Sequence, residues 1–142
     1  MRRLLSVVLT MTLILLSANT ALAAVPESSE IVPMYNYIQT YDACLTIDED
    51  TAVATCEASC YTVSGCTVEI ESKLQYNAAG SWVTLKTWTD TGSRYAGIYE
   101  TRVVVSGFTY RLRTTYFVYN SAGSLVESTN VTRTYVYPPQ NT

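Results

Sequence analysis

A regular alternation of apolar and polar side chains, with a period of two residues, runs through most of the chain after residue 34. In the segment 67–76, for example, Val68 and Ile70 alternate with Glu69 and Glu71. Successive side chains of a β-strand point to opposite faces of its sheet, so this period predicts strands that bury one face. No amphipathic helical period of useful length appears, and the chain is rich in Thr, Val and Tyr, which suit a pleated, half-buried surface.

Turn sequences such as NAAGS at 77–81 and NSAGS at 120–124 interrupt the alternation every 8–14 residues. About seven or eight strands separated in this way predict an all-β fold, an immunoglobulin-like antiparallel β-sandwich. The length suits a single domain, which we place at residues 35–142. The predicted strands cover residues 35–47, 52–62, 67–76, 82–89, 96–105, 108–119 and 125–137.

Residues 1–23 have the layout of a secretory signal peptide. A basic start, MRR, precedes an uncharged and mostly apolar run at residues 4–16, and Ala21 and Ala23 occupy the small-residue positions of a cleavage site. The apolar run is shorter than the ~20 residues that span a bilayer, so we expect cleavage and no remaining membrane span. The protein is therefore expected to be secreted, with residues 24–34 as a flexible lead-in to the sandwich.

Four cysteines lie close together in the sequence, and an even number of cysteines in an exported chain favours disulfides. Their spacing contains no C-x-x-C pair and the chain has no histidine, so neither a zinc site nor a thioredoxin-like site is expected. Hairpin turns at 48–50 and 62–65 favour the pairs Cys44–Cys56 and Cys60–Cys66. The crossed pairs Cys44–Cys60 and Cys56–Cys66 stay open if the first strands do not form hairpins. Bonding Cys56 to Cys60 is disfavoured, because they lie about 13 Å apart on an extended strand.

The segment SGFTYRLRTTYFVYNSAGSLVES, at residues 106–128, resembles the late strands of fibronectin type III and related immunoglobulin-like domains. The resemblance rests on Gly107 and Tyr110 at the opening of a strand and on Asn120 and Gly123 in the following turn. It implies that Tyr110 occupies the position of the tyrosine corner in such folds. The layout of the whole chain is also similar to that of small secreted proteins of Gram-positive bacteria. Neither resemblance implies a function, because this fold carries many.

The residue inventory excludes several kinds of chemistry. Without histidine the chain lacks Ser-His-Asp and Cys-His catalysis, and its six glycines form no phosphate-binding loop. Its formal net charge of −3 becomes more negative once Arg2 and Arg3 leave with the signal, which argues against nucleic acid as a partner. We expect no cofactor, no metal site and no enzymatic activity. The remaining catalytic alternative is a hydrolase that uses carboxylates such as Glu69 and Glu71.

Aromatic side chains give the remaining indication of function. In the segment WVTLKTW, strict alternation places Trp82 and Trp88 on one strand face and Val83 and Leu85 on the other. If the aliphatic pair faces the core, both tryptophans are exposed and provide rings for a sugar or a partner protein; otherwise they cap the core. We therefore expect a secreted, non-catalytic binding or interaction module whose partner is a glycan or a surface protein. A structural or protein-interaction domain of the cell surface is the alternative, and the sequence does not indicate the oligomeric state.

Overall fold

The computed structural model describes residues 34–141 of the chain, so the predicted signal peptide and most of the predicted lead-in lie outside the described residues. Seven strands account for most of these residues, and no helix among them is long and apolar enough to cross a membrane. The strands are β1 (Ile38–Asp48), β2 (Val53–Thr62), β3 (Thr67–Ala78), β4 (Ser81–Ser93), β5 (Tyr95–Val103), β6 (Phe108–Tyr119) and β7 (Leu125–Tyr137).

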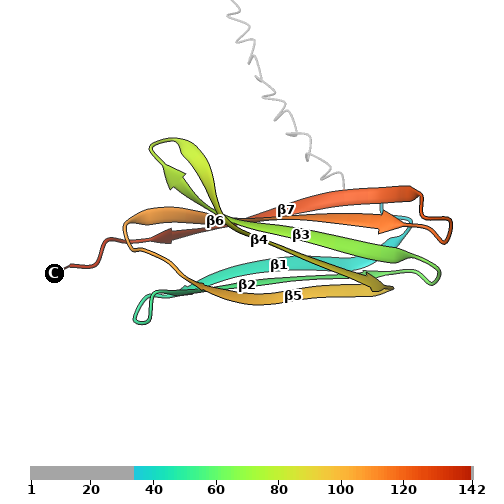
Figure 1. Cartoon of the computed structure of the whole chain (residues 1–142), viewed down its shortest axis with the longest axis horizontal. Coiled ribbons are helices and arrows are strands. Elements are labelled where there is room, and N and C mark those ends of the chain that lie inside the picture. The colour runs from blue at the N-terminus through green and yellow to red at the C-terminus, as the bar shows by residue number, and fades with distance from the viewer. Residues whose placement is uncertain (1–33, 142) are drawn as a thin grey trace, which may run out of the picture. The chain divides into compact units, whose positions relative to one another are not determined.

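The seven strands form two antiparallel sheets that stack as two layers (Figure 1). One sheet has three strands in the order β1-β2-β5, and the other has four strands in the order β4-β3-β6-β7. This arrangement confirms the predicted all-β sandwich. The chain crosses between the sheets after β2, after β4 and after β5, and each crossing places the apolar face of the next strand against the opposite layer.

The crossing from β4 to β5 differs from the sequence prediction. The predicted strands 82–89 and 96–105 leave six residues between them, but β4 continues to Ser93 and only Arg94 separates it from β5. Arg94 adopts a left-handed conformation, with φ of 65°. Its N–H donates to the carbonyl of Cys66 and its own carbonyl accepts from the N–H of Thr62, so one residue joins both layers. The predicted end of this strand at residue 89 is therefore wrong, because β4 pairs with β3 as far as Ser93.

The core lies between the sheets and follows the predicted alternation. Every second residue of β3 and β6 is buried, including Ile70, Leu74, Leu112 and Val118. The buried hydroxyl groups of Ser72 and Thr114 pair across these strands, with 2.8 Å between Ser72 Oγ and Thr114 Oγ1.

Tyr110 lies near the start of β6 and makes the contact that the sequence resemblance implied. Its phenol donates to the carbonyl of Val105 at 2.6 Å and accepts from the N–H of the same residue at 2.9 Å. The ring is buried, so the hydroxyl group needs such partners. This corner fixes the connection between β5 and β6.

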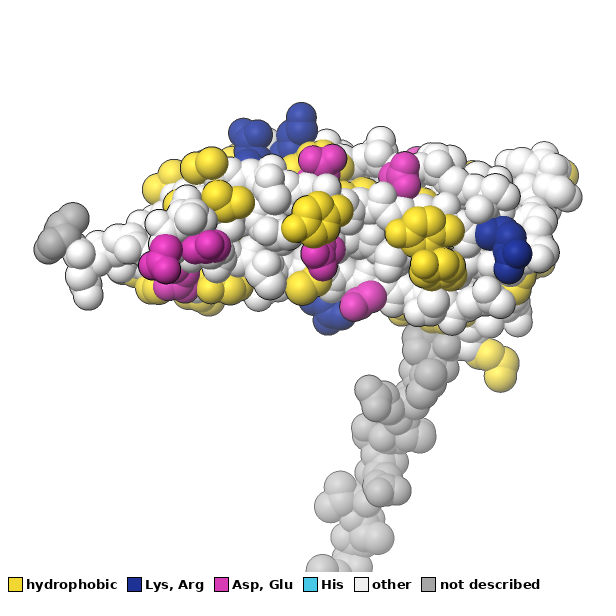
Figure 2. Space-filling model, turned by 90° about the horizontal axis from the view of Figure 1, so that it is seen from below, with side chains coloured by type: hydrophobic (Ala, Val, Ile, Leu, Met, Phe, Trp, Pro, Cys, Tyr) yellow, Lys and Arg dark blue, Asp and Glu magenta, His cyan; other side chains and the backbone are white. Residues whose placement is uncertain are grey.

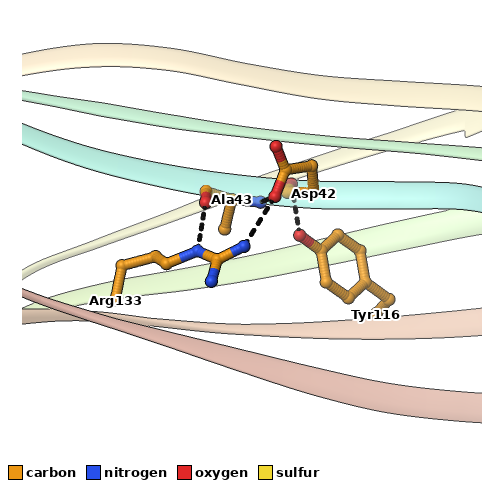
Figure 3. Close-up of polar contacts among 4 residues, drawn as sticks. All are labelled: Asp42, Ala43, Tyr116 and Arg133. Carbon is orange, nitrogen blue, oxygen red and sulfur yellow. Dashed lines mark hydrogen bonds and ion pairs between the residues drawn. The ribbon is translucent and has the colours of Figure 1, made fainter.

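The edge of β1 is held by side chains that reach across from the other sheet. Tyr116 donates its phenol to the carbonyl of Asp42 at 2.6 Å, and Arg133 Nε donates to the carbonyl of Ala43 at 2.7 Å (Figure 3). The Arg133 guanidinium also bonds the Asp42 carboxylate at 2.9 Å and holds the pKa of that carboxyl below its usual range. These contacts join β1 to β6 and β7.

We call the line of contacts between β1 and β7 the seam. Farther along it, the Glu127 carboxylate of β7 accepts three backbone N–H groups at the start of β1. The donors are Asn36, Tyr37 and Ile38, at 2.9, 3.1 and 2.7 Å. A charged acceptor makes these bonds stronger than neutral ones. The first residues before and in β1 are therefore anchored to β7.

The predicted disulfides are absent, because all four cysteines are unbonded in the structure. The hairpin turn between β1 and β2 sets Leu45 opposite Cys56, and Cys44 lies opposite Glu57. Cys44 is consequently exposed on the outer face, whereas Cys56, Cys60 and Cys66 are buried in the core. The Cys44–Cys56 pairing was wrong by one residue of register, which reverses the face of a strand side chain. In the alternative Cys44–Cys60 pairing, Cys60 lies opposite Tyr41, three residues from Cys44 and again on the other face. Cys60 and Cys66 share the core side but are not bonded to each other.

The cysteines are expected to differ sharply in reactivity. Burial raises the pKa of the Cys56 thiol to about 12 and that of the Cys60 thiol to about 11, so little reactive thiolate forms near neutrality. At pH 8, an alkylating reagent should label Cys44 alone in the folded protein. After unfolding without a reductant, mass spectrometry should find four labelled cysteines. Fewer than four would reveal a disulfide and contradict the structure.

Stability is expected to fall at alkaline pH. Burial raises the pKa of the Cys56 and Cys60 thiols above their ordinary value of 9.0, and burial also raises the pKa of the Tyr116 phenol. The folded state therefore favours the protonated groups. Their contribution is complete below about pH 9 and is lost as the pH rises toward 11–12. Urea unfolding between pH 7 and 11 should show a stable plateau followed by a decline. A free energy of unfolding that stays constant to pH 11 would contradict the burial of these groups.

Candidate binding surface

The two candidate tryptophans do not lie on the same face of β4. Gln75 pairs with Thr84 and its neighbour Leu74 pairs with Lys86, so Leu85 is an extra residue that forms a β-bulge. Such a bulge shifts the alternation of the strand by one residue. Trp82 therefore lies opposite Asn77 on the outer face, whereas Trp88 lies opposite the buried Ser72 on the core face. The prediction that they share one face was wrong, because alternation alone does not reveal a bulge.

Trp88 and Trp82 have different surroundings as a result. Trp88 is half-buried and packs against the core cluster. Trp82 is covered by the Arg111 guanidinium, whose Cζ lies 4.1 Å from the ring centroid. Arg111 Nε also donates to Gln75 Oε1 at 2.7 Å, and Gln75 Nε2 donates to Thr84 Oγ1 at 2.9 Å. The ring face that would stack on a ligand is thus occupied by a fixed cation.

Replacement of each tryptophan by alanine should separate these two environments. Trp88→Ala is expected to cost about 2–3 kcal/mol of stability, somewhat less than the ~3–5 kcal/mol of a fully buried ring. Trp82→Ala removes mainly a cation–π contact and should cost about 1 kcal/mol or less. Thermal and urea unfolding of both variants measures the difference. Equal losses would contradict the bulge at Leu85.

The two glutamates considered for hydrolysis lie on the outer face of β3. Glu71 forms an ion pair with Lys73, with 2.8 Å between the charged atoms, and both side chains are well exposed. Within residues 34–141, no group of three His, Cys, Asp or Glu side chains could hold a metal ion. These residues therefore do not form an enclosed site.

A different set of aromatic residues is exposed on the three-stranded sheet. Tyr61 of β2 and Tyr95 and Tyr99 of β5 all point to the outer face, and these residues are 48, 45 and 70% exposed. The Tyr61 and Tyr95 rings lie 4.5 Å apart between centroids and are tilted by 39°. We call these three residues the tyrosine face. Figure 2 shows this side of the molecule, where hydrophobic side chains form separate patches with acidic side chains beside them.

A shallow pocket of about 260 Å³ lies on the tyrosine face. Its polar lining comes from all three strands of the sheet, and its members are Asp42, Cys44, Glu57, Ser59, Tyr95 and Tyr99. Gly97 leaves room for the Tyr95 side chain, because a Cβ atom at residue 97 would lie 2.3 Å from the Tyr95 phenol oxygen. The Tyr95 ring therefore lies along its own strand and forms one wall of the pocket.

The sequence contains a signal for the tyrosine face that the tryptophan argument overlooked. Tyr95 and Tyr99 alternate with Ala96 and Ile98, which are buried, and Tyr61 follows the buried Cys60. Alternation therefore predicts that each tyrosine is exposed. It does not predict that they meet, because β2 and β5 become neighbours only through the sheet topology.

A second pocket, of about 330 Å³, lies where the chain leaves β5 for β6. It is mainly apolar. Its lining includes Tyr76 and Leu85 from β3 and β4, and Val103, Val105 and Phe108 from the end of β5, the connection and the start of β6. The pocket is thus built from the tyrosine corner and its surroundings. It has few polar groups to orient a ligand, in contrast to the pocket on the tyrosine face.

No protein-family model and no curated protein matches the chain. The class of molecule is therefore defined by its fold and surface: a seven-stranded antiparallel β-sandwich with exposed tyrosines around a shallow acidic pocket. An argument about function rests on the chemistry of that surface.

Proposed function

We propose that the protein is an exported, non-catalytic binding module with an immunoglobulin-like fold, and that the tyrosine face binds a neutral glycan. The observation that carries the proposal is the pocket itself, where the exposed Tyr95 and Tyr99 meet two carboxylates and a serine hydroxyl. The Tyr61 ring packs against Tyr95 beside the pocket. Aromatic rings stack on the apolar faces of sugars, and carboxylates accept hydrogen bonds from sugar hydroxyl groups.

The fold assignment is supported by the arrangement of the strands. In immunoglobulin domains the first, second and fifth strands share one sheet, and the third, sixth and seventh share the other. Here β1, β2 and β5 are together, and β3, β6 and β7 are together, with β4 beside β3. The corner made by Tyr110 adds a second feature of the fibronectin type III and immunoglobulin-like domains that residues 106–128 resemble.

The charge of the pocket favours a neutral ligand. Asp42 and Glu57 both line it, and the Asp42 carboxyl stays ionised well below neutral pH because Arg133 lowers its pKa. Anionic polymers such as nucleic acids would be repelled by these groups. An enzyme that hydrolysed a glycan would need two carboxyl groups on either side of the scissile bond. Glu71 is instead ion-paired with Lys73 on the outer face of β3.

The alternative is a protein-interaction domain of the cell surface. It is favoured by the free strand edges of the sandwich, which offer backbone groups to another chain. The two proposals involve different parts of β5, namely its outer face and its edge, so they can be tested separately.

A binding experiment with tyrosine variants tests the glycan proposal. The protein from Ala24 onward is screened against neutral oligosaccharides and polysaccharides, and affinity for the best ligand is measured by calorimetry. Tyr99→Ala should weaken binding about tenfold, or roughly 1.4 kcal/mol, because the exposed ring is desolvated only in the complex. Its melting temperature should stay close to that of the wild type.

Tyr119→Ala is the matched control, because Tyr119 lies on the outer face of the four-stranded sheet and should leave affinity unchanged. The glycan proposal fails if no neutral glycan binds. It also fails if Tyr99→Ala and Tyr119→Ala have the same effect.

A further inference from the structure

The two open sides of the sandwich differ in how their strand edges are covered. On the side of β1 and β7, Glu127 accepts the N–H groups of Asn36, Tyr37 and Ile38, and Tyr116 and Arg133 donate to the carbonyls that follow. Side chains thus bond backbone groups at the start and in the middle of β1. Such covering prevents an edge strand from pairing with another chain.

On the other side, the edge of β5 is covered only near its start. The N–H of Gly97 points to the open edge, since it donates to Asp90 Oδ2 at 2.9 Å. Backbone groups alternate in direction along a strand, so the N–H and carbonyl groups of Tyr99, Thr101 and Val103 also point to this edge. Between residues 34 and 141, none of these groups has a hydrogen-bonding partner.

The same stretch of β5 carries two opposite charges. Glu100 and Arg102 are both exposed, and they flank Thr101. The described part of the chain contains two ion pairs, Lys73 with Glu71 and Arg133 with Asp42, and neither involves the β5 charges. When two copies of such a strand pair antiparallel about the central residue, the acid of each copy lies opposite the base of the other. The open edge of β5 is therefore complementary to the same edge of a second copy.

We propose that β5 pairs antiparallel with β5 of a second copy of this chain, about a two-fold axis at Thr101. In this register Thr101 faces its own counterpart, and Tyr99 faces Val103 of the second copy. All of these residues direct their backbone groups to the open edge, so each pair exchanges two hydrogen bonds. The pairing gives a hydrogen-bonding partner to the edge-facing N–H and carbonyl groups of Tyr99, Thr101 and Val103.

The charges and apolar side chains agree with this register. Glu100 of each copy lies opposite Arg102 of the other, so the two-fold axis makes two favourable cross-strand pairs. Val103, which is 73% exposed in the single chain, packs beside Tyr99 of the second copy. A register shifted by two residues would lose the charge pairs, and thus the sequence of β5 selects one alignment.

The dimer joins the two three-stranded sheets into one continuous sheet of six strands. The tyrosine faces of both copies then lie on the same side of that sheet, because a two-fold axis perpendicular to a sheet keeps its faces. The inference does not rest on glycan binding, since it concerns the edge of β5 rather than its face. If both proposals hold, the dimer presents two pockets to one polymeric ligand.

Charge reversal tests the register directly. Sedimentation equilibrium of the wild type should show a reversible monomer–dimer equilibrium that depends on concentration. Glu100→Arg and Arg102→Glu should each weaken dimerisation at least about tenfold, because each places like charges opposite each other twice. The double variant Glu100→Arg/Arg102→Glu should restore it. Arg113→Glu, on a central strand, is the control and should leave the equilibrium unchanged.

Disulfide trapping provides an independent measurement of the axis. In a Cys44→Ser background, Thr101→Cys should form a covalent dimer under mild oxidation, because paired residues of this type lie about 5.5 Å apart between Cα atoms. Thr132→Cys, an exposed position on the β7 edge, should remain monomeric. Circular dichroism confirms that each variant is folded.

A wild type that sediments as a monomer up to about 1 mM, the range of very weak binding, would overturn the proposal. A double charge variant that dimerises no better than the single variants would overturn it as well. Loss of glycan binding by Tyr99→Ala has no bearing on either result.

Discussion

Hydrogen bonds from side chains of one sheet to the backbone of the other hold this sandwich closed along one side. Tyr116 and Arg133 donate to consecutive carbonyls of β1, and Glu127 accepts the N–H groups before and at its start. Most side-chain contacts between stacked sheets are apolar and have no direction. These contacts are directional and partly charged, so they fix the position of β1 along β7 as well as its distance.

The closed seam gives the molecule two unlike sides. On the side of β1, side chains of β6 and β7 bond the backbone at the start and in the middle of the strand, and these groups are not open to a partner. On the side of β5, the backbone beyond Gly97 is free, and the outer face of the same strand carries Tyr95 and Tyr99. A single strand therefore contributes a face with hydrogen-bonding groups for a small polar ligand and an edge for a protein chain. The proposed functions follow from this division.

Much of the fold could be predicted from the sequence, because alternation reports burial one strand at a time. The seven strands were found in this way, whereas the corner at Tyr110 was implied by the resemblance of residues 106–128 to immunoglobulin-like domains. The pairing of Cys44 was not predictable, since it depends on how many residues the first hairpin turn uses, and one residue reverses a face. The faces of Trp82 and Trp88 were not predictable for the same reason, because the bulge at Leu85 adds one residue without a recognisable signal.

The candidate binding surface could also be predicted only in part, because alternation within one strand does not reveal which strands are neighbours. Each of Tyr61, Tyr95 and Tyr99 is exposed by a local pattern that can be read in the sequence. Their meeting is a property of the sheet, in which β2 pairs with β5 although β3 and β4 lie between them in the sequence. Local periodicity contains no information on such neighbours. Proximity in space, and hence the pocket, became visible only with the strand order.

The hydrogen bonds along the β1–β7 seam also determine how the domain would bear a mechanical load. β1 begins beside Glu127, near the start of β7, while β7 ends beside Glu49, where the Tyr137 phenol donates to the Glu49 carbonyl at the far end of β1. A force that pulls residue 34 away from residue 141 therefore slides β1 along β7. Sliding stretches the contacts of Glu127, Tyr116 and Arg133 together rather than one after another. The seam would act as a shear clamp that resists extension until all of its bonds yield at once.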